Sequence, residues 1–170
     1  MDNEGLLQKI ECIRNELHRI KESKSIARHK RNRLKYREAT LHLLLNKVAK
    51  KYRVLGFSLE SECDEALKFN SNNIVFSLEP RRFVMSSSKK DVALQFVPIQ
   101  GPSEPSLIHY DIKLLTGSID EYIACLYWEK DKNTSGYWGL TYKDRNIYSK
   151  PFTDELFELL LSDMSQVTRR

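Results

Sequence analysis

Proline and glycine are scarce in this chain of 170 residues, with five and six copies, and neither occurs between Leu6 and Leu55. These are the two residues that most often break a helix, so nothing in this stretch would interrupt one. A continuous helix of that length would extend roughly 75 Å at 1.5 Å per residue. We therefore expect one long helix in the N-terminal third.

Cysteines and long apolar runs are also scarce. The three cysteines, Cys12, Cys63 and Cys125, are odd in number and widely spaced, which fits reduced thiols in the cytosol or nucleus. No apolar run is long enough for a membrane span or a signal-peptide core. The histidines and cysteines lack ligand spacing, and no glycine-rich phosphate loop is present. We therefore expect no metal, no cofactor, no membrane partner and no enzymatic activity.

A heptad repeat runs through the N-terminal third. From Leu6, eight positions spaced by seven are apolar, and we assign them to d. The interleaved a positions are charged in the centre, at Lys24, Arg31 and Glu38. The expected oligomerisation seam is Leu6, Ile10, Ile13, Leu17, Ile20, Leu34, Leu41, Leu45, Val48 and Tyr52. One narrow seam on so long a helix needs a partner, so we expect a coiled-coil stem.

The weak centre of the seam, residues 24–33, bears on the choice of partner. In a parallel homodimer Arg31 would face Arg31 of the other chain, which is unfavourable. Either the partner is a different chain with acidic residues there, or the helix bends or breaks in this stretch. We favour a heterodimer over a homodimer, within a complex that has further subunits.

Positive charge is concentrated in the stem. Residues 1–54 carry a net charge of +9 and residues 55–170 a net charge of −4, and nine of the nineteen residues from Arg19 to Arg37 are basic. The favoured interpretation is a solvated helix face. The alternatives are a nuclear import signal at 30–33 and contact with nucleic-acid phosphates. The residues expected to make such contacts are Arg28, Lys30, Arg31 and Arg33. A nuclear location is expected.

After Arg53 the apolar period changes from 3.5 to 2, so the domain boundary is expected between a basic coiled-coil stem at 1–53 and a globular head at 54–170. Strands are expected at 55–59, 66–69, 74–78, 83–85, 92–97, 107–115, 122–128 and 137–142, with a helix as the alternative at 122–128. Pro80 with Arg81 and Arg82 should end the third strand, and loops should follow at 86–90 and from Pro98. Thr153 should cap a C-terminal helix. The expected class is α+β, a small antiparallel sheet with that helix packed on it.

Two groups in the head are candidates for function. Asp111 and Lys113 on one strand, with Asp91 earlier, follow the acidic-x-lysine pattern of metal-dependent nucleases, but an amphipathic strand gives the same pattern and is preferred. Tyrosines and tryptophans are dense between 122 and 148. We interpret them as sheet core, with a partner-binding groove as the alternative.

The junction between stem and head carries a resemblance. The sequence Tyr-Arg-Val-Leu-Gly-Phe-Ser-Leu-Glu at 52–60, followed by Leu-Lys-Phe at 67–69, resembles the coiled-coil-plus-RWD subunits of the kinetochore. The resemblance covers the stem and residues 52–80. It implies an RWD-like head and a non-enzymatic scaffold that acts in kinetochore assembly at the centromere and in chromosome segregation during the cell cycle.

Overall fold

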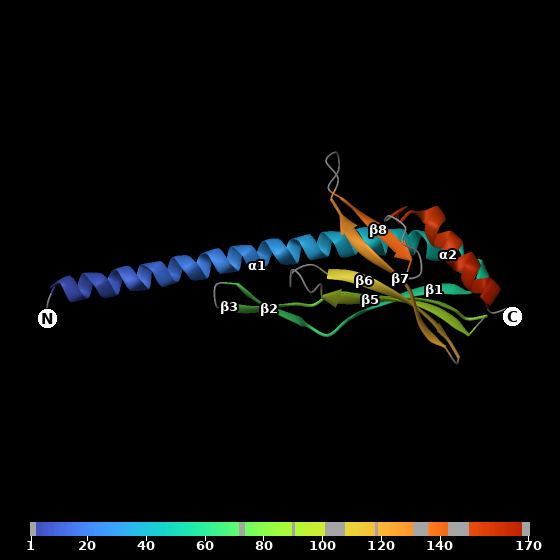
Figure 1. Ribbon diagram of the computed structural model, residues 1–170, viewed down its shortest axis with the longest axis horizontal. Helices are drawn as coiled ribbons and strands as arrows, with labels where there is room; N and C mark the ends of the chain where they lie inside the picture. The colour runs from blue at the N-terminus through green and yellow to red at the C-terminus, as the bar shows by residue number, and fades with distance from the viewer. Residues whose placement is uncertain are drawn as a thin grey trace.

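The longest element of the molecule is helix α1, which spans Asn3–Lys51 without interruption. The computed structural model describes residues 3–71, 74–89, 91–100, 108–117, 119–130, 136–142 and 150–167. Figure 1 shows α1 extending well beyond the head at its N-terminal end. The expected long helix is confirmed, and it is continuous through residues 24–33, where a bend or break was one of the two alternatives.

Helix α1 ends in a tight reversal at Gly56. A 3₁₀ turn, η1, spans Arg53–Leu55, and Gly56 caps it with φ +87°. This left-handed conformation favours glycine, and a Cβ at Gly56 would lie 2.7 Å from Ser88 Oγ. The reversal sends the chain back along the helix as the first strand, so the head folds against the half of α1 that precedes it.

The head is built on a seven-stranded antiparallel sheet of order β1-β4-β5-β6-β7-β8-β9, and β2 and β3 form a separate hairpin. The strand bounds are β1 Phe57–Cys63, β2 Leu67–Ser71, β3 Ile74–Leu78, β4 Arg81–Ser87, β5 Val92–Gln100, β6 Ile108–Thr116, β7 Asp120–Glu129, β8 Tyr137–Tyr142 and β9 Lys150–Pro151. The α+β class with an antiparallel sheet is confirmed, as is the strand at 74–78.

Two expectations about strand ends were wrong. The third strand does end before Pro80, but the next strand, β4, begins at Arg81 and not at Phe83 as expected, and it pairs with β1 in the main sheet. Pro98 does not begin a loop but lies inside β5, opposite Tyr110 of β6. The ladder between β4 and β5 ends at Phe96, so Pro98 has a partner strand, β6, on one side only. The N–H that proline lacks is tolerated there because the other side has no strand to bond.

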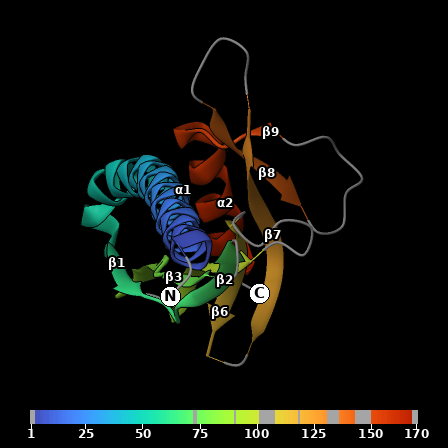
Figure 2. The same cartoon turned by 90° about the vertical axis from the view of Figure 1, so that its left-hand side faces the viewer.

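Both helices lie on the concave side of a curved sheet. Helix α2 spans Asp154–Val167, and the Leu156 N–H donates to Thr153 Oγ1 at 3.3 Å, which confirms the expected cap. Viewed along α1, the sheet curves around the two helices from β1 on one side to β8 on the other (Figure 2). Helix α2 is tied to the end of α1 by an ion pair between Lys51 and Glu158 at 2.7 Å.

The core takes in the C-terminal half of α1. Leu41 and Leu45 are completely buried, and Val48 is 1% exposed. They belong to one cluster with buried residues of β4, β5, β6 and α2, including Phe83, Phe96, Tyr110 and Phe157. The sequence boundary expected near 54 marks the end of the helix, while the core extends back into α1.

Replacing Leu41 with alanine should destabilise the whole head, because it leaves a cavity where the helix meets the sheet. The expected loss in the free energy of unfolding is about 3 kcal/mol. Leu43→Ala, two residues away on a side chain that is 74% exposed, should change stability by less than about 0.5 kcal/mol. Urea denaturation of both variants measures the difference, and equal losses would show that the helix is not part of the core.

Candidate interaction site on the N-terminal helix

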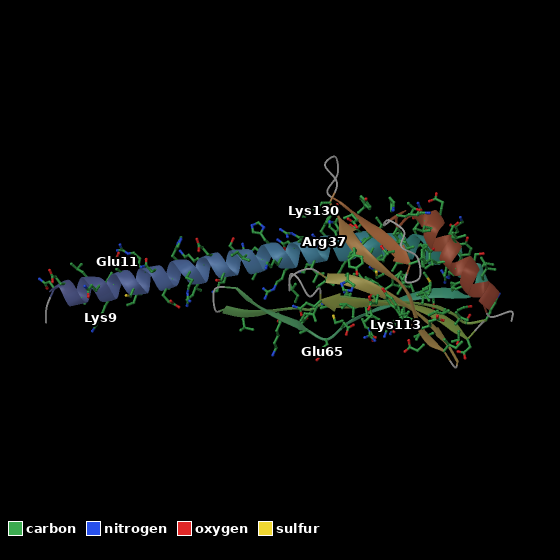
Figure 3. All side chains as sticks on the ribbon, in the orientation of Figure 1. Lys9, Glu11, Arg37, Glu65, Lys113 and Lys130 are labelled. Atoms are coloured by element: carbon green, nitrogen blue, oxygen red, sulfur yellow. The ribbon has the colours of Figure 1, made fainter. Side chains whose placement is uncertain are left out.

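An apolar ridge lies on the part of α1 that projects from the head. It consists of Leu6, Ile10, Ile13 and Leu17, whose exposed fractions are 48, 43, 61 and 56%. Leu7 flanks it and is 65% exposed, whereas Ile20 at its inner end is half-buried. Figure 3, with Lys9 and Glu11 labelled on the same segment, shows that none of the described strands and no part of α2 reaches this part of α1. The ridge therefore presents large aliphatic side chains to solvent.

The remaining seam residues contact the chain's own head. Leu41, Leu45 and Val48 lie in the main core, and half-buried Tyr52 packs against it. Leu34 is 8% exposed and joins Ala27 in a second cluster with Leu78 of β3 and Ile108 of β6. The head therefore covers the apolar seam residues in the C-terminal half of α1, whereas the four seam residues from Leu6 to Leu17 are open to solvent.

The open ridge and the buried face point in different directions. Positions seven apart drift by about 20° per heptad on a straight α-helix, so Ile13 faces about 80° away from Leu41, four heptads later. Steps of 3.6 residues from Leu17 lead instead to Lys24, Arg28, Arg31 and Lys35, all of them exposed. The apolar ridge thus continues along the helix as a basic stripe, defined by these four residues.

The residues expected to contact nucleic acid fall on and around this stripe. Arg28, Arg31 and Arg33 are exposed, and Lys30 is half-buried. Arg31 and Lys35 also line a cleft of about 580 Å³ between α1 and the ends of β3 and β4. The stretch is therefore not uniformly solvated, because part of its charge faces the head.

Two polar side chains that fix α1 on the sheet were not identified from the sequence. Glu38 is 9% exposed and accepts a hydrogen bond from the Arg81 N–H at 2.9 Å. The backbone oxygen of buried Arg37 accepts from Trp138 Nε1 at 2.9 Å, and its guanidinium lies 5.3 Å from the Trp128 ring centre. The sequence does single out Glu38, because it is a charged residue at an a position. In a coiled coil, however, a charge at that position is read as a weak point of the seam and not as a contact with the chain's own sheet.

Burial is the main influence on Glu38. It raises the pKa of this carboxyl above its ordinary value, although the hydrogen bond from Arg81 and the charges of Arg81 and Lys35 act in the opposite direction. The carboxylate is therefore less favourable in the folded protein than in the unfolded chain. The hydrogen bond orients α1 over β4 at an electrostatic cost.

A second group of polar and aromatic side chains lies on the face of the sheet away from the helices, where Tyr127 is 44% exposed and His109 and Asp111 are half-buried. The His109 ring stacks on Tyr127 with centres 4.9 Å apart, and His109 Nε2 lies 3.5 Å from an Asp111 oxygen. Burial lowers the pKa of His109, and Asp111 opposes that shift. A hydrogen bond with the Cys125 thiol and burial raise the pKa of Tyr127 to about 12. These groups form a polar and aromatic patch on β6 and β7, suited to contact with another protein.

The structure does not bring the nuclease-like residues together. Asp91 lies beside Gly117 at one end of β6, and Asp111 is six residues away along the strand, about 20 Å at 3.3 Å per residue. In the described part of the chain, no three histidine, cysteine, aspartate or glutamate side chains are grouped as a metal site would require. Nor is any helix there long and apolar enough to cross a membrane. Of the aromatic group, Trp138 is core, whereas Tyr148 lies outside the described residues.

Comparisons with protein-family models, with curated proteins and with solved structures give no match. Among the described residues, the ridge, the basic stripe and the sheet patch are the candidate interaction surfaces.

Substituting glutamine for Glu38 should make the protein more stable at pH 7, because the amide oxygen can still accept from the Arg81 N–H without a buried charge. A raised folded-state pKa means that the wild-type group favours folding at pH below about 4 and that this contribution is lost as pH rises through the folded pKa. The stability advantage of Glu38→Gln should therefore grow between pH 4 and pH 7, as measured by thermal melting across that range. A stability advantage that shrinks over this range would contradict the conclusion that burial raises the pKa of Glu38.

Proposed function

We propose that this protein is a non-enzymatic structural subunit that pairs through the apolar ridge of α1 and contacts further partners through its head. The observation that carries the proposal is the exposure of Leu6, Ile10, Ile13 and Leu17 in register on a projecting helix. A contiguous apolar patch on a surface marks an interaction site. Its helical spacing suits a partner that is also a helix.

The energetics of the projecting segment support pairing. A lone helix gains most of its stability in proteins from packing an amphipathic face, and short isolated helices are marginal in water. Residues 3–18 are all exposed except for half-buried Gly5. The head therefore contributes little to keeping this segment helical. A helix laid on the ridge would supply the missing apolar contacts and stabilise the segment.

A role in kinetochore assembly and chromosome segregation, in the nucleus, is the more specific form of this proposal. Its support is the resemblance at residues 52–80 to coiled-coil-plus-RWD subunits. The same order of parts adds to it: a long N-terminal helix, a glycine junction, an antiparallel sheet and a final helix. The patch around His109 and Tyr127 is the surface we assign to further subunits.

A charge placed on the ridge should abolish pairing through it. We expect tagged Ile13→Glu to lose at least one chain, an untagged copy of this protein included, that co-purifies with the tagged wild-type protein from its own cells, because a carboxylate in a coiled-coil seam loses its hydration. Asn15→Glu, on the opposite face of the same turn, adds the same charge and should keep them. Mass spectrometry identifies these chains, and centromere proteins are expected among them. Equal recovery with both variants, or a wild-type chain that is a lone monomer in the cell, would refute the pairing.

Contact with nucleic acid is a second candidate function, favoured by the density of exposed charge at Arg28, Arg31 and Arg33. Neutralising these residues together with Lys30 should weaken binding to duplex DNA and lower the slope of log affinity against log salt by about one per lost phosphate contact. Neutralising Lys68 and Lys130, which are exposed on the head, is the control. Wild-type binding that is absent, or that does not depend on salt, would exclude this function.

A further inference from the structure

We infer that the apolar ridge is covered by the same ridge of a second copy of the chain, running antiparallel. This inference rests on the proposed pairing function and names the partner. Leu6 of one copy lies opposite Leu17 of the other, and Ile10 lies opposite Ile13. The arrangement follows from the spacing of the ridge, the placement of charge along α1 and the position of the head.

The ridge is complementary to itself in the antiparallel direction. Antiparallel coiled coils pack a positions of one helix against d positions of the other. Leu6 and Ile13 are d positions, and Ile10 and Leu17 are a positions. One two-fold axis, passing between residues 11 and 12, therefore gives four aliphatic layers without a gap or a polar residue. Asn3 of the second copy comes opposite Ile20, so the overlap ends before the basic stripe begins at Lys24.

The distribution of charge along α1 favours antiparallel over parallel pairing. Residues 3–20 carry three acidic and three basic side chains, whereas residues 21–37 carry one acidic and eight basic ones. A parallel homodimer in register would place Lys24, Arg28, Arg31 and Lys35 opposite their own copies. An antiparallel pair overlaps only the balanced segment and holds the two basic stripes at opposite ends, so the repulsion that argues against a parallel homodimer does not arise.

The positions beside the ridge favour the antiparallel direction too. In that direction g positions face g positions, so Lys9 meets Glu16 of the second copy, and the symmetry gives this opposite-charge contact twice. In a parallel pair Lys9 would instead meet Arg14 of the other copy, a repulsive contact, and Glu16 would meet Lys21, an attractive one, so the flanking charges there give no net gain. Glu16 pairs with Arg19 in the single chain, an exposed contact that is easily exchanged. The e positions bring exposed Leu7 against the alkyl stem of Arg14.

The size of the overlap sets the expected strength. Half-exposed side chains on two short helices would bury about 1,000 Å² in total, near the lower limit for a specific interface. We therefore expect a dissociation constant on the order of micromolar. The resulting molecule has a head at each end of a short two-helix rod.

Reversing the charges of the flanking pair tests the direction. Dimerisation of the full chain is measured by sedimentation equilibrium from about 1 to 500 µM. Lys9→Glu should weaken it about fivefold, because the introduced carboxylate repels Glu16 of the second copy at both contacts. Glu16→Lys should weaken it similarly, and the double variant Lys9→Glu/Glu16→Lys should restore the wild-type constant to within about twofold. Lys130→Glu, which makes the same charge change on the head, should leave the constant unchanged.

The parallel arrangement gives a different result with Lys9→Glu. There the carboxylate of Lys9→Glu would face Arg14 and tighten the dimer, so a tighter or unchanged constant for Lys9→Glu overturns the inference. Failure of the double variant to recover would also overturn it, provided that circular dichroism shows the helix and sheet intact. These readouts separate the direction of pairing from a general loss of folding.

A distance measurement gives an independent check. In a Cys12→Ser/Cys63→Ser background, a spin label on Glu22→Cys should lie about 30 Å from its copy along the rod, because 21 helical steps of 1.5 Å separate the two. A parallel pair would hold the labels under about 20 Å apart. A chain that stays monomeric at 500 µM overturns self-pairing alone. The proposed function would fail as well if Ile13→Glu also left the cellular complex intact or if the wild-type chain were a lone monomer in the cell.

Discussion

The packing of Leu41, Leu45 and Val48 into the sheet is the contact on which the rest of the structure depends. It fixes the C-terminal half of α1 as the central element of the head, with β4, β5 and β6 beneath it and α2 beside it. No glycine or proline lies between this half and Leu6, so the backbone has no place to turn. The anchored half therefore projects the other half into solvent in a fixed direction. The exposed ridge is a consequence of where the helix is anchored.

Much of the fold could be predicted from the sequence, because local patterns determine it. The alternation of Ile108, Tyr110, Ile112 and Leu114 inward along β6 follows the strand period, and the absence of helix breakers gives α1. Pairing between strands that are distant in the sequence is harder to predict, because it leaves little local pattern in the sequence. Pro98 suggested a loop because the sequence does not show that β5 has lost one neighbour there. Arg81 suggested an end because its backbone partner, Glu38, is 43 residues away.

The candidate site was predicted in part, and the missing part has a physical cause. A heptad shows that an apolar seam is covered, but the pattern is the same whether the cover is another chain or the chain's own sheet. Leu41 and Ile13 are equivalent in the repeat, yet one is completely buried and the other 61% exposed. The drift of a straight helix away from a strict seven-residue repeat then separates their directions. The charged residue Glu38, which weakened the case for a continuous seam, is the point where α1 bonds to β4.

The anchored and the projecting parts of α1 differ in how their charged and polar groups are used. Where the helix is anchored, the sheet supplies apolar cover and a few hydrogen bonds, such as that from Trp138 to the Arg37 oxygen. Where it projects, acidic and basic residues are balanced around an aliphatic ridge, a composition that tolerates close approach by an identical segment. The basic stripe lies between these two parts of the helix. Repulsion between like charges prevents it from pairing with its own copy. The stripe therefore limits how far a second copy can overlap, so the separation of the two heads follows from the sequence of one helix.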